Sequence, residues 1–198
     1  MAYGNLIDGR AIAAQLQGEL IQRIAALKAR GLQAGLAFVR VGEDPASKVY
    51  VGRKEKTSVE LGIVSETHVL PEVASEAELL QLIAKLNADP RLHGILVQAP
   101  LPKHIRQEVV YASVLPAKDV DGFHPVNVGL LSQGRVRFAP CTPFGVMEML
   151  RREGIDPRGK RAVVVGRSSL VGSPMANLLL HKGVQGDATV TVAHSRTP

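Results

Sequence analysis

The chain has 198 residues, of which 45% are hydrophobic and 21% charged, so a disordered chain is excluded and one large or two small domains are expected. A single cysteine excludes a disulfide framework and cysteine-rich metal sites, and the six scattered histidines offer no His-x-x-x-His pair. We therefore expect no metal. The net charge of +6 favours an anionic partner, either nucleic acid or a small polyanionic ligand.

Two classes of partner have little support in the sequence. No segment approaches the ~20 apolar residues that cross a bilayer. The basic residues are scattered, and three tyrosines, four phenylalanines and no tryptophan leave few rings for base stacking. The N-terminus also lacks a basic start followed by an apolar run. We expect a cytoplasmic protein that binds neither membrane nor nucleic acid.

Helices and strands alternate over the first hundred residues. Asp44 followed by Pro45 is typical of a helix start, and Ser75 with Glu78 has capping-box spacing. Such alternation predicts a mainly parallel α/β sheet. The expected helices cover residues 11–30, 45–61 and 75–86, and the expected strands 36–41, 63–70 and 93–98.

The second half of the chain begins like a dinucleotide-binding fold. Residues 119–143 are rich in Gly, Pro and Asn and lack periodicity, which indicates a connection between domains. After it we expect helices from Thr142 to Leu150 and over 174–180, and strands over 161–166 and 188–193. The predicted organisation is an α/β domain, residues 1–139, followed by a Rossmann-like domain, residues 140–198. Because a complete Rossmann fold has six strands and two are found, we expect the second domain to be incomplete.

A glycine-rich turn follows the strand that ends near Gly166. Gly166, Arg167 and Ser168 open the turn, and Gly172 lies close to the next helix. Glycines there let backbone N–H groups approach a phosphate at the positive end of a helix. Since the spacing is not Gly-x-Gly-x-x-Gly, an ordinary strand-to-helix turn stays an alternative.

The end of the next strand indicates which nucleotide would bind. Sites that prefer NAD usually have Asp or Glu there to hold the ribose hydroxyls. Here the chain reads His194-Ser195-Arg196-Thr197, without an acid. Because serine and arginine suit a ribose phosphate, the sequence predicts NADP.

Tyr50 and Lys54 are candidates for the chemistry. They lie four residues apart on one predicted helix and therefore share a face. A lysine beside a phenol, partly removed from water, could exchange protons near neutral pH. The alternative is an ordinary surface pair. In short-chain dehydrogenases a Tyr-x-x-x-Lys pair follows the glycine-rich turn, but here it precedes that turn, so this relationship is excluded.

Two further polar residues lie where ligands are often held. Gln98 ends an apolar strand, and its amide can both donate and accept hydrogen bonds. Asp121 lies in a loop with Gly122, where a carboxylate can bind a guanidine-like ring edge through paired hydrogen bonds. A structural strand-end glutamine and a turn-forming aspartate are the respective alternatives.

Taken together, these segments resemble the bifunctional methylenetetrahydrofolate dehydrogenase/methenyltetrahydrofolate cyclohydrolase family. The match runs in family order from the first helix to Thr197. It is carried by VGEDPASKVYVGRKEK, GILVQAPLPKHI, KDVDGFHPVNVGLLSQG, PCTPFGVMEML, GRSSLVGSPMANLLL and TVTVAHSRT. The resemblance implies oxidation of 5,10-methylenetetrahydrofolate by NADP, then hydrolysis to 10-formyltetrahydrofolate. It places the chain in one-carbon metabolism, which serves purine and amino-acid biosynthesis, and implies a cytoplasmic homodimer.

The resemblance also implies roles for single residues. Lys54 would be the central catalytic group, Gln98 would position it, Tyr50 would contact the folate and Asp121 would bind the pterin edge. Four further residues match the nucleotide site of the family: Gly166, Arg167, Ser168 and Ser195. Arg196, directly after Ser195, is a further candidate for nucleotide binding. Two other functions stay open, a shikimate-dehydrogenase-like NADP oxidoreductase and a non-catalytic fragment that binds folate or a partner.

Overall fold

The computed structural model describes residues 6–183 and 185–198. Its contacts divide the chain into two compact units. The first unit comprises Gln17–Val120, and the second comprises Met1–Leu16 with Asp121–Pro198. Helix α1 (Gly9–Ala29) begins in the second unit and ends in the first. The boundary at residue 139 between functional domains stays a prediction.

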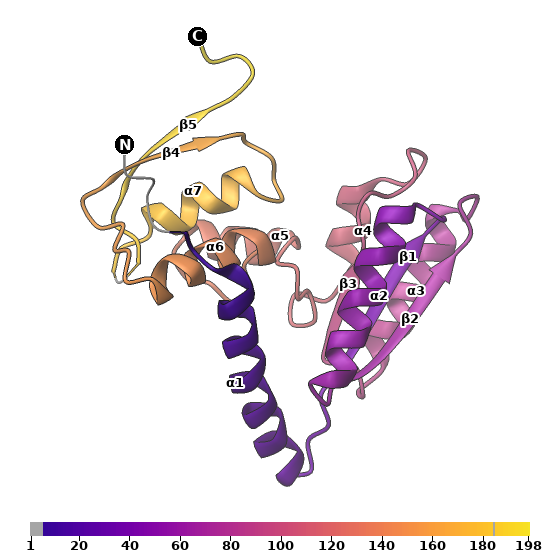
Figure 1. Ribbon diagram of the computed structural model, residues 1–198. Helices are drawn as coiled ribbons and strands as arrows, with labels where there is room; N and C mark the ends of the chain where they lie inside the picture. The colour runs from indigo at the N-terminus through magenta and orange to yellow at the C-terminus, as the bar shows by residue number, and fades with distance from the viewer. Residues whose placement is uncertain (1–5, 184) are drawn as a thin grey trace. The chain divides into compact units, whose positions relative to one another are not determined.

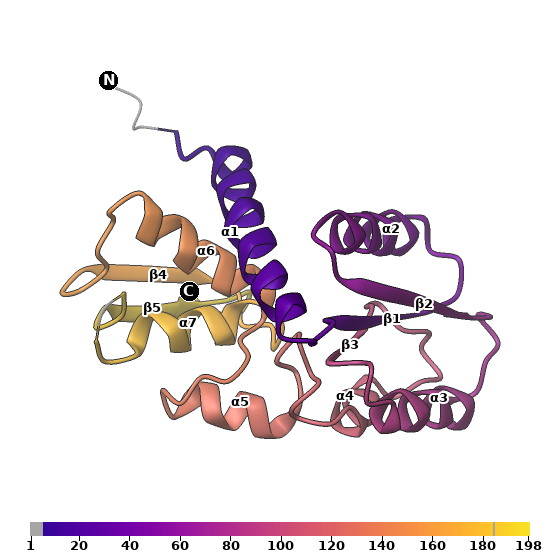
Figure 2. The ribbon, with the colours of Figure 1, turned by 90° about the horizontal axis from the view of Figure 1, so that it is seen from below.

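The first unit is a parallel sheet with helices on both faces. Its strand order is β2-β1-β3, and Leu36 of β1 lies between Ser65 and Gly94 of its neighbours. Helix α2 covers one face of this sheet, and α3 and α4 cover the other (Figures 1 and 2). The elements are β1 (Gly35–Val41), α2 (Pro45–Glu60), β2 (Val64–Leu70), α3 (Glu76–Ala88), β3 (Gly94–Val97) and α4 (Gln107–Ser113).

The central strand β1 is buried on both faces, which explains its continuous apolar sequence. On one face Phe38 packs with Val51 of α2 and Leu96 of β3. Leu79 and Ile83 of α3 are fully buried. Helix α3 begins at a complete capping box, in which Ser75 and Glu78 each bind the other's backbone N–H. These contacts hold α2 and β3 on a common scaffold.

The second unit contains a smaller parallel sheet. Strand β4 pairs with β5, and Leu178 and Leu179 of α7 are buried in a cluster with Leu131 and Met147. Glu148 of α6 binds Arg151 and Arg152, and the Arg151 guanidinium contributes most to lowering the pKa of Glu148 to about 2. The elements are α5 (Pro125–Ser132), α6 (Cys141–Arg152), β4 (Arg161–Val165), α7 (Gly172–Leu180) and β5 (Thr189–Ala193).

The expected α/β class with parallel strands is confirmed, and each expected helix or strand is present within a few residues of its predicted ends. The reading of residues 119–143 as a connection without periodic structure is wrong in part, because α5 lies inside it and α6 begins at Cys141. Helix α4 was not expected either. Both missed helices have eight residues or fewer, too short to display a clear 3.6-residue period.

Truncating Ile83 to alanine should lower the free energy of unfolding by about 2–5 kcal/mol, because it leaves a cavity in a fully buried site. Urea denaturation followed by circular dichroism measures the loss. Val73→Ala is the matched control, since Val73 is 86% exposed and its truncation should change little. Equal losses in the two variants would contradict the assigned core.

Candidate active site

Helix α2 begins at a well-defined cap. Asp44 Oδ2 accepts a hydrogen bond of 2.7 Å from the Ser47 backbone N–H, and Pro45 occupies the first turn. That bond, supported by the nearby Arg40 guanidinium, lowers the pKa of Asp44. Gly42 precedes the cap with φ of +81°, and a Cβ there would lie 2.0 Å from the Glu72 carboxylate. The turn therefore fixes where α2 starts and which residues face the sheet.

Lys54 and Gln98 meet across two elements of the first unit. Lys54 Nζ donates to Gln98 Oε1 at 3.0 Å. Gln98 follows β3 directly, and its backbone N–H is bound to Val39 O at 2.8 Å. Its side-chain Nε2 donates to Ala99 O at 2.6 Å, which leaves the oxygen for the lysine. Gln98 thus holds the amine at the carboxyl-terminal edge of the sheet, where parallel α/β folds bind ligands.

Tyr50 lies one helical turn before Lys54 on the same side of α2. It is 56% exposed, so its ring is available to a ligand. Lys54 is exposed as well and remains accessible from water. The structure therefore brings three of the four predicted chemical residues to one edge of the first unit: Tyr50, Lys54 and Gln98.

Asp121 belongs to the second unit. Cys141 Sγ lies 3.9 Å from Asp121 Oδ1, a weak contact at the start of α6. Gly122 has φ of +71°, and a Cβ there would lie 2.9 Å from Phe138 O, so this turn requires glycine. A common pocket for Asp121 and Lys54 stays a prediction.

Sequence reasoning missed Ser47. This residue is buried, and its Oγ donates to Ala99 O at 3.4 Å, which ties the first turn of α2 to the chain after β3. The Ala99 carbonyl also accepts a hydrogen bond from Gln98 Nε2. The bonds from Ser47 and Gln98 together therefore help to fix the Gln98 side chain. Its position in the sequence could have indicated that it is buried, since Ser47 lies one turn before the apolar Val51 on the same side of α2.

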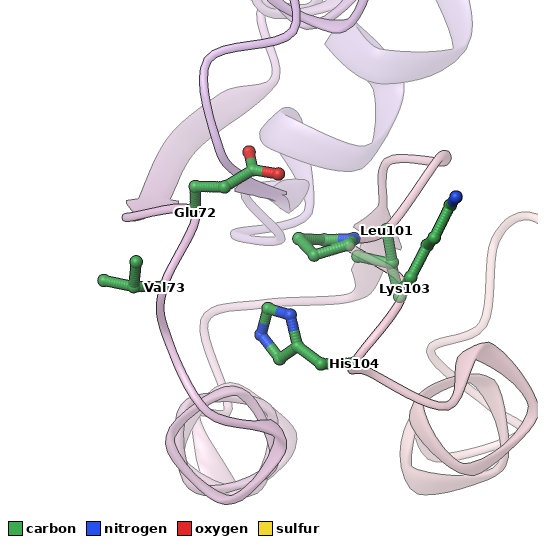
Figure 3. A pocket seen from close by; sticks show the side chains of 6 residues that line it. Glu72, Val73, Leu101, Lys103 and His104 are labelled. Carbon is green, nitrogen blue, oxygen red and sulfur yellow. The ribbon is translucent and has the colours of Figure 1, made fainter.

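A hollow of about 720 Å³ at the same edge of the sheet was also not predicted. Its lining comes from Glu72 and Val73 after β2 and from residues 101–104 after β3 (Figure 3). His104 Nε2 lies 2.8 Å from Ala74 O, which holds the imidazole between the two loops. None of the predicted chemical residues lines this hollow.

The glycine-rich turn is built for close backbone approach. Gly166 follows β4 with φ of +124°, and a Cβ on Gly172 would lie 2.3 Å from Gly166 O. Ser168 Oγ accepts hydrogen bonds from Val171 N at 3.1 Å and Gly172 N at 3.3 Å. Arg167 is exposed beside them. The turn therefore presents a positive helix end and a guanidinium, which together suit phosphate.

Ser195 and Arg196 leave the sheet beside this turn. Gly166 N donates to Ala193 O at 2.7 Å, so the ends of β4 and β5 are adjacent. His194 Nδ1 accepts from Arg196 N at 3.1 Å and shapes the turn after β5. The side chains of Ser195 and Arg196 are both exposed. The five predicted nucleotide residues thus lie on two neighbouring strand ends.

Across residues 6–183 and 185–198, no three His, Cys, Asp or Glu side chains are grouped as a metal site would require. No helix in the described part of the chain has the length and apolar character needed to cross a membrane.

Comparison with known proteins identifies the family. Residues 7–121 match the model of the tetrahydrofolate dehydrogenase/cyclohydrolase catalytic domain, and residues 140–198 match that of its NAD(P)-binding domain. The chain belongs to the tetrahydrofolate dehydrogenase/cyclohydrolase family. Both alternatives, the shikimate-dehydrogenase-like enzyme and the non-catalytic fragment, lose support from this match.

Individual relatives agree along almost the whole chain. The bifunctional protein FolD of Anaeromyxobacter dehalogenans is 58% identical over 98% of the chain, which spans 67% of that relative. The crystal structure of the bifunctional enzyme FolD from Campylobacter jejuni superposes with a TM-score of 0.93 at 46% identity, over 98% of this chain and 67% of that one. The Trypanosoma brucei enzyme, solved with NADP cofactor and inhibitor, has a TM-score of 0.93 at 39% identity, over 100% and 67%.

Replacing Gly172 by alanine should weaken nucleotide binding at least about tenfold, because the new Cβ would collide with Gly166 O and displace the turn. Titration calorimetry with NADP measures the change. Gly145→Ala in α6 is the control, since open space surrounds that position. An unchanged affinity in the Gly172 variant would remove this turn from the nucleotide site.

Proposed function

We propose that this chain oxidises 5,10-methylenetetrahydrofolate to 5,10-methenyltetrahydrofolate and hydrolyses the product to 10-formyltetrahydrofolate. The observation that carries the proposal is the Lys54–Gln98 hydrogen bond, in a chain that matches both domain models of the family. The reactions place it in one-carbon metabolism, which serves purine and amino-acid biosynthesis. We further propose that it acts in the cytoplasm as a homodimer, divided functionally at residue 139.

The proposed chemistry assigns a distinct task to each polar residue. Lys54 transfers protons while water adds to the methenyl carbon and the bond to one folate nitrogen breaks. Gln98 holds the Lys54 amine and contacts the reacting end of the folate. Tyr50 supplies an exposed ring and hydroxyl for the folate, and Asp121 binds the donor groups of the pterin edge. Orientation of these groups against one carbon provides much of the rate enhancement.

NADP is the proposed redox partner, and the residues present fit it. Glycine at position 172 lets the backbone after β4 pass close to the start of α7, where the positive helix end would hold a pyrophosphate. Arg196 and Ser195 stand where an acid would select NAD, and Arg167 supplies a second guanidinium. When bound, NADP would accept the hydride that the methylene carbon gives up.

Substituting Lys54 by methionine should abolish hydrolysis of the methenyl bridge, because the proton-transferring amine is lost. The decay of methenyltetrahydrofolate absorbance measures it. Lys56→Met is the matched control, because that side chain is 77% exposed and forms an exposed ion pair with Glu60 on the same helix. Hydrolysis at the normal rate in the Lys54 variant would remove this residue from its role.

Replacing Arg196 by glutamine should raise the Kd for NADP about tenfold and leave that for NAD nearly unchanged, since only NADP has the ribose phosphate. Parallel titrations with the two nucleotides give the ratio. A wild-type preference for NAD would refute the assignment of NADP. Turnover of shikimate instead of methylenetetrahydrofolate would refute the proposed substrate.

A further inference from the structure

The segment that precedes Asp121 is fastened beside β3. Lys118 O accepts the Ile95 N–H at 2.7 Å, and Ile95 forms a parallel bridge with Asp119. The backbone N–H groups of Lys118 and Asp119 both donate to Leu115 O, at 2.7 and 3.0 Å. The chain therefore approaches residue 121 along a fixed path.

The Lys118 side chain anchors this path to the end of α3. Its Nζ donates to the carbonyl oxygens of Leu86 at 3.2 Å, Asn87 at 2.8 Å and Asp89 at 2.7 Å. Carbonyls at a helix C-terminus lack intrahelical partners, and the helix dipole is negative there. Three ammonium donors thus meet three acceptors, which leaves the lysine little rotational freedom.

Val120 connects the same segment to the elements of the proposed catalytic residues. It packs against the cluster of Phe38, Val51 and Leu96. Val51 lies on α2 between Tyr50 and Lys54, and Leu96 lies on β3 two residues before Gln98. A displacement at Lys118 would therefore be transmitted to Val120 and to the residue that follows it.

Capping α3 is not a sufficient account of Lys118. Asn87 already joins the end of α3 to the end of α4, because its side chain donates to Ser113 O at 2.8 Å and accepts from Leu115 N at 3.0 Å. Those bonds secure the chain up to residue 115. Lys118 adds an attachment three residues further on, directly before the segment that ends at Asp121.

We propose that Lys118 is a positioning residue for folate binding. By occupying the carbonyls at the end of α3 it fixes the course of residues 118–120 beside β3, and with it the point from which the chain continues into Asp121. This inference rests on the proposed function, in which Asp121 binds the pterin edge.

A double-mutant cycle on the whole chain tests the inference. The variants are Lys118→Met, Asp121→Ala and the two combined, and calorimetry gives the Kd of 5-formyltetrahydrofolate for each. Lys118→Met alone should raise this Kd about tenfold, but it should add nothing once Asp121 is removed, because it acts through that carboxylate. Lys118→Arg keeps the positive charge and several hydrogen-bond donors. Its Kd for 5-formyltetrahydrofolate should therefore stay within about threefold of the wild-type value.

Lys85→Met is the matched control, since it removes an exposed lysine from the last turn of α3, the helix whose carbonyls Lys118 binds. If Lys118→Met does not fold, Lys118→Gln keeps an amide donor and enters the same cycle. Additive effects, or an unchanged Kd in a folded Lys118 variant, would overturn the positioning role alone. A wild-type chain that binds no folate would overturn the proposed function and this inference together.

Discussion

The hydrogen bond between Lys54 Nζ and Gln98 Oε1 joins residues 44 positions apart, and it constrains both elements that carry them. Helix α2 must begin directly after its cap Asp44, and β3 must end at Val97, because a shift of α2 by one residue would rotate Lys54 by about 100° away from the sheet edge. The Asp44 cap sets the first condition. Pairing of β3 with the buried strand β1 sets the second.

Local signals were sufficient for most of the fold. Asp44 with Pro45 and Ser75 with Glu78 define helix starts through bonds within one turn, so they can be read without knowledge of the rest of the chain. Helix α5 was missed for the opposite reason. Its buried residues are Asn127 and Leu131, and a buried asparagine looks like a loop residue in sequence. Its helical state depends on packing against other elements rather than on its own pattern.

The candidate site was predictable as a set of positions but not as a set of bonds. Gln98 and Ser195 could be found because polar residues at the ends of apolar strands stand out. The Ser47–Ala99 bond could not, since it depends on how α2 lies against β3. Lys118 likewise looks like a surface charge in sequence, although its three acceptors are carbonyls about thirty residues earlier. Every residue has a backbone carbonyl, so the sequence does not show which carbonyls a lysine will bind.

The two helix starts differ in charge, and this difference separates two kinds of ligand. At α2 the carboxylate of Asp44 caps the N-terminus and offsets its positive dipole. At α7 the cap is Val171, whose side chain makes no cap hydrogen bond, and Arg167 adds positive charge nearby. The Asp44 carboxylate therefore disfavours an anion at the start of α2, whereas the cap of α7 has no such carboxylate. This difference agrees with the match of residues 140–198 to an NAD(P)-binding domain, because the cofactor of such a domain brings its phosphates to a helix start without an acidic cap.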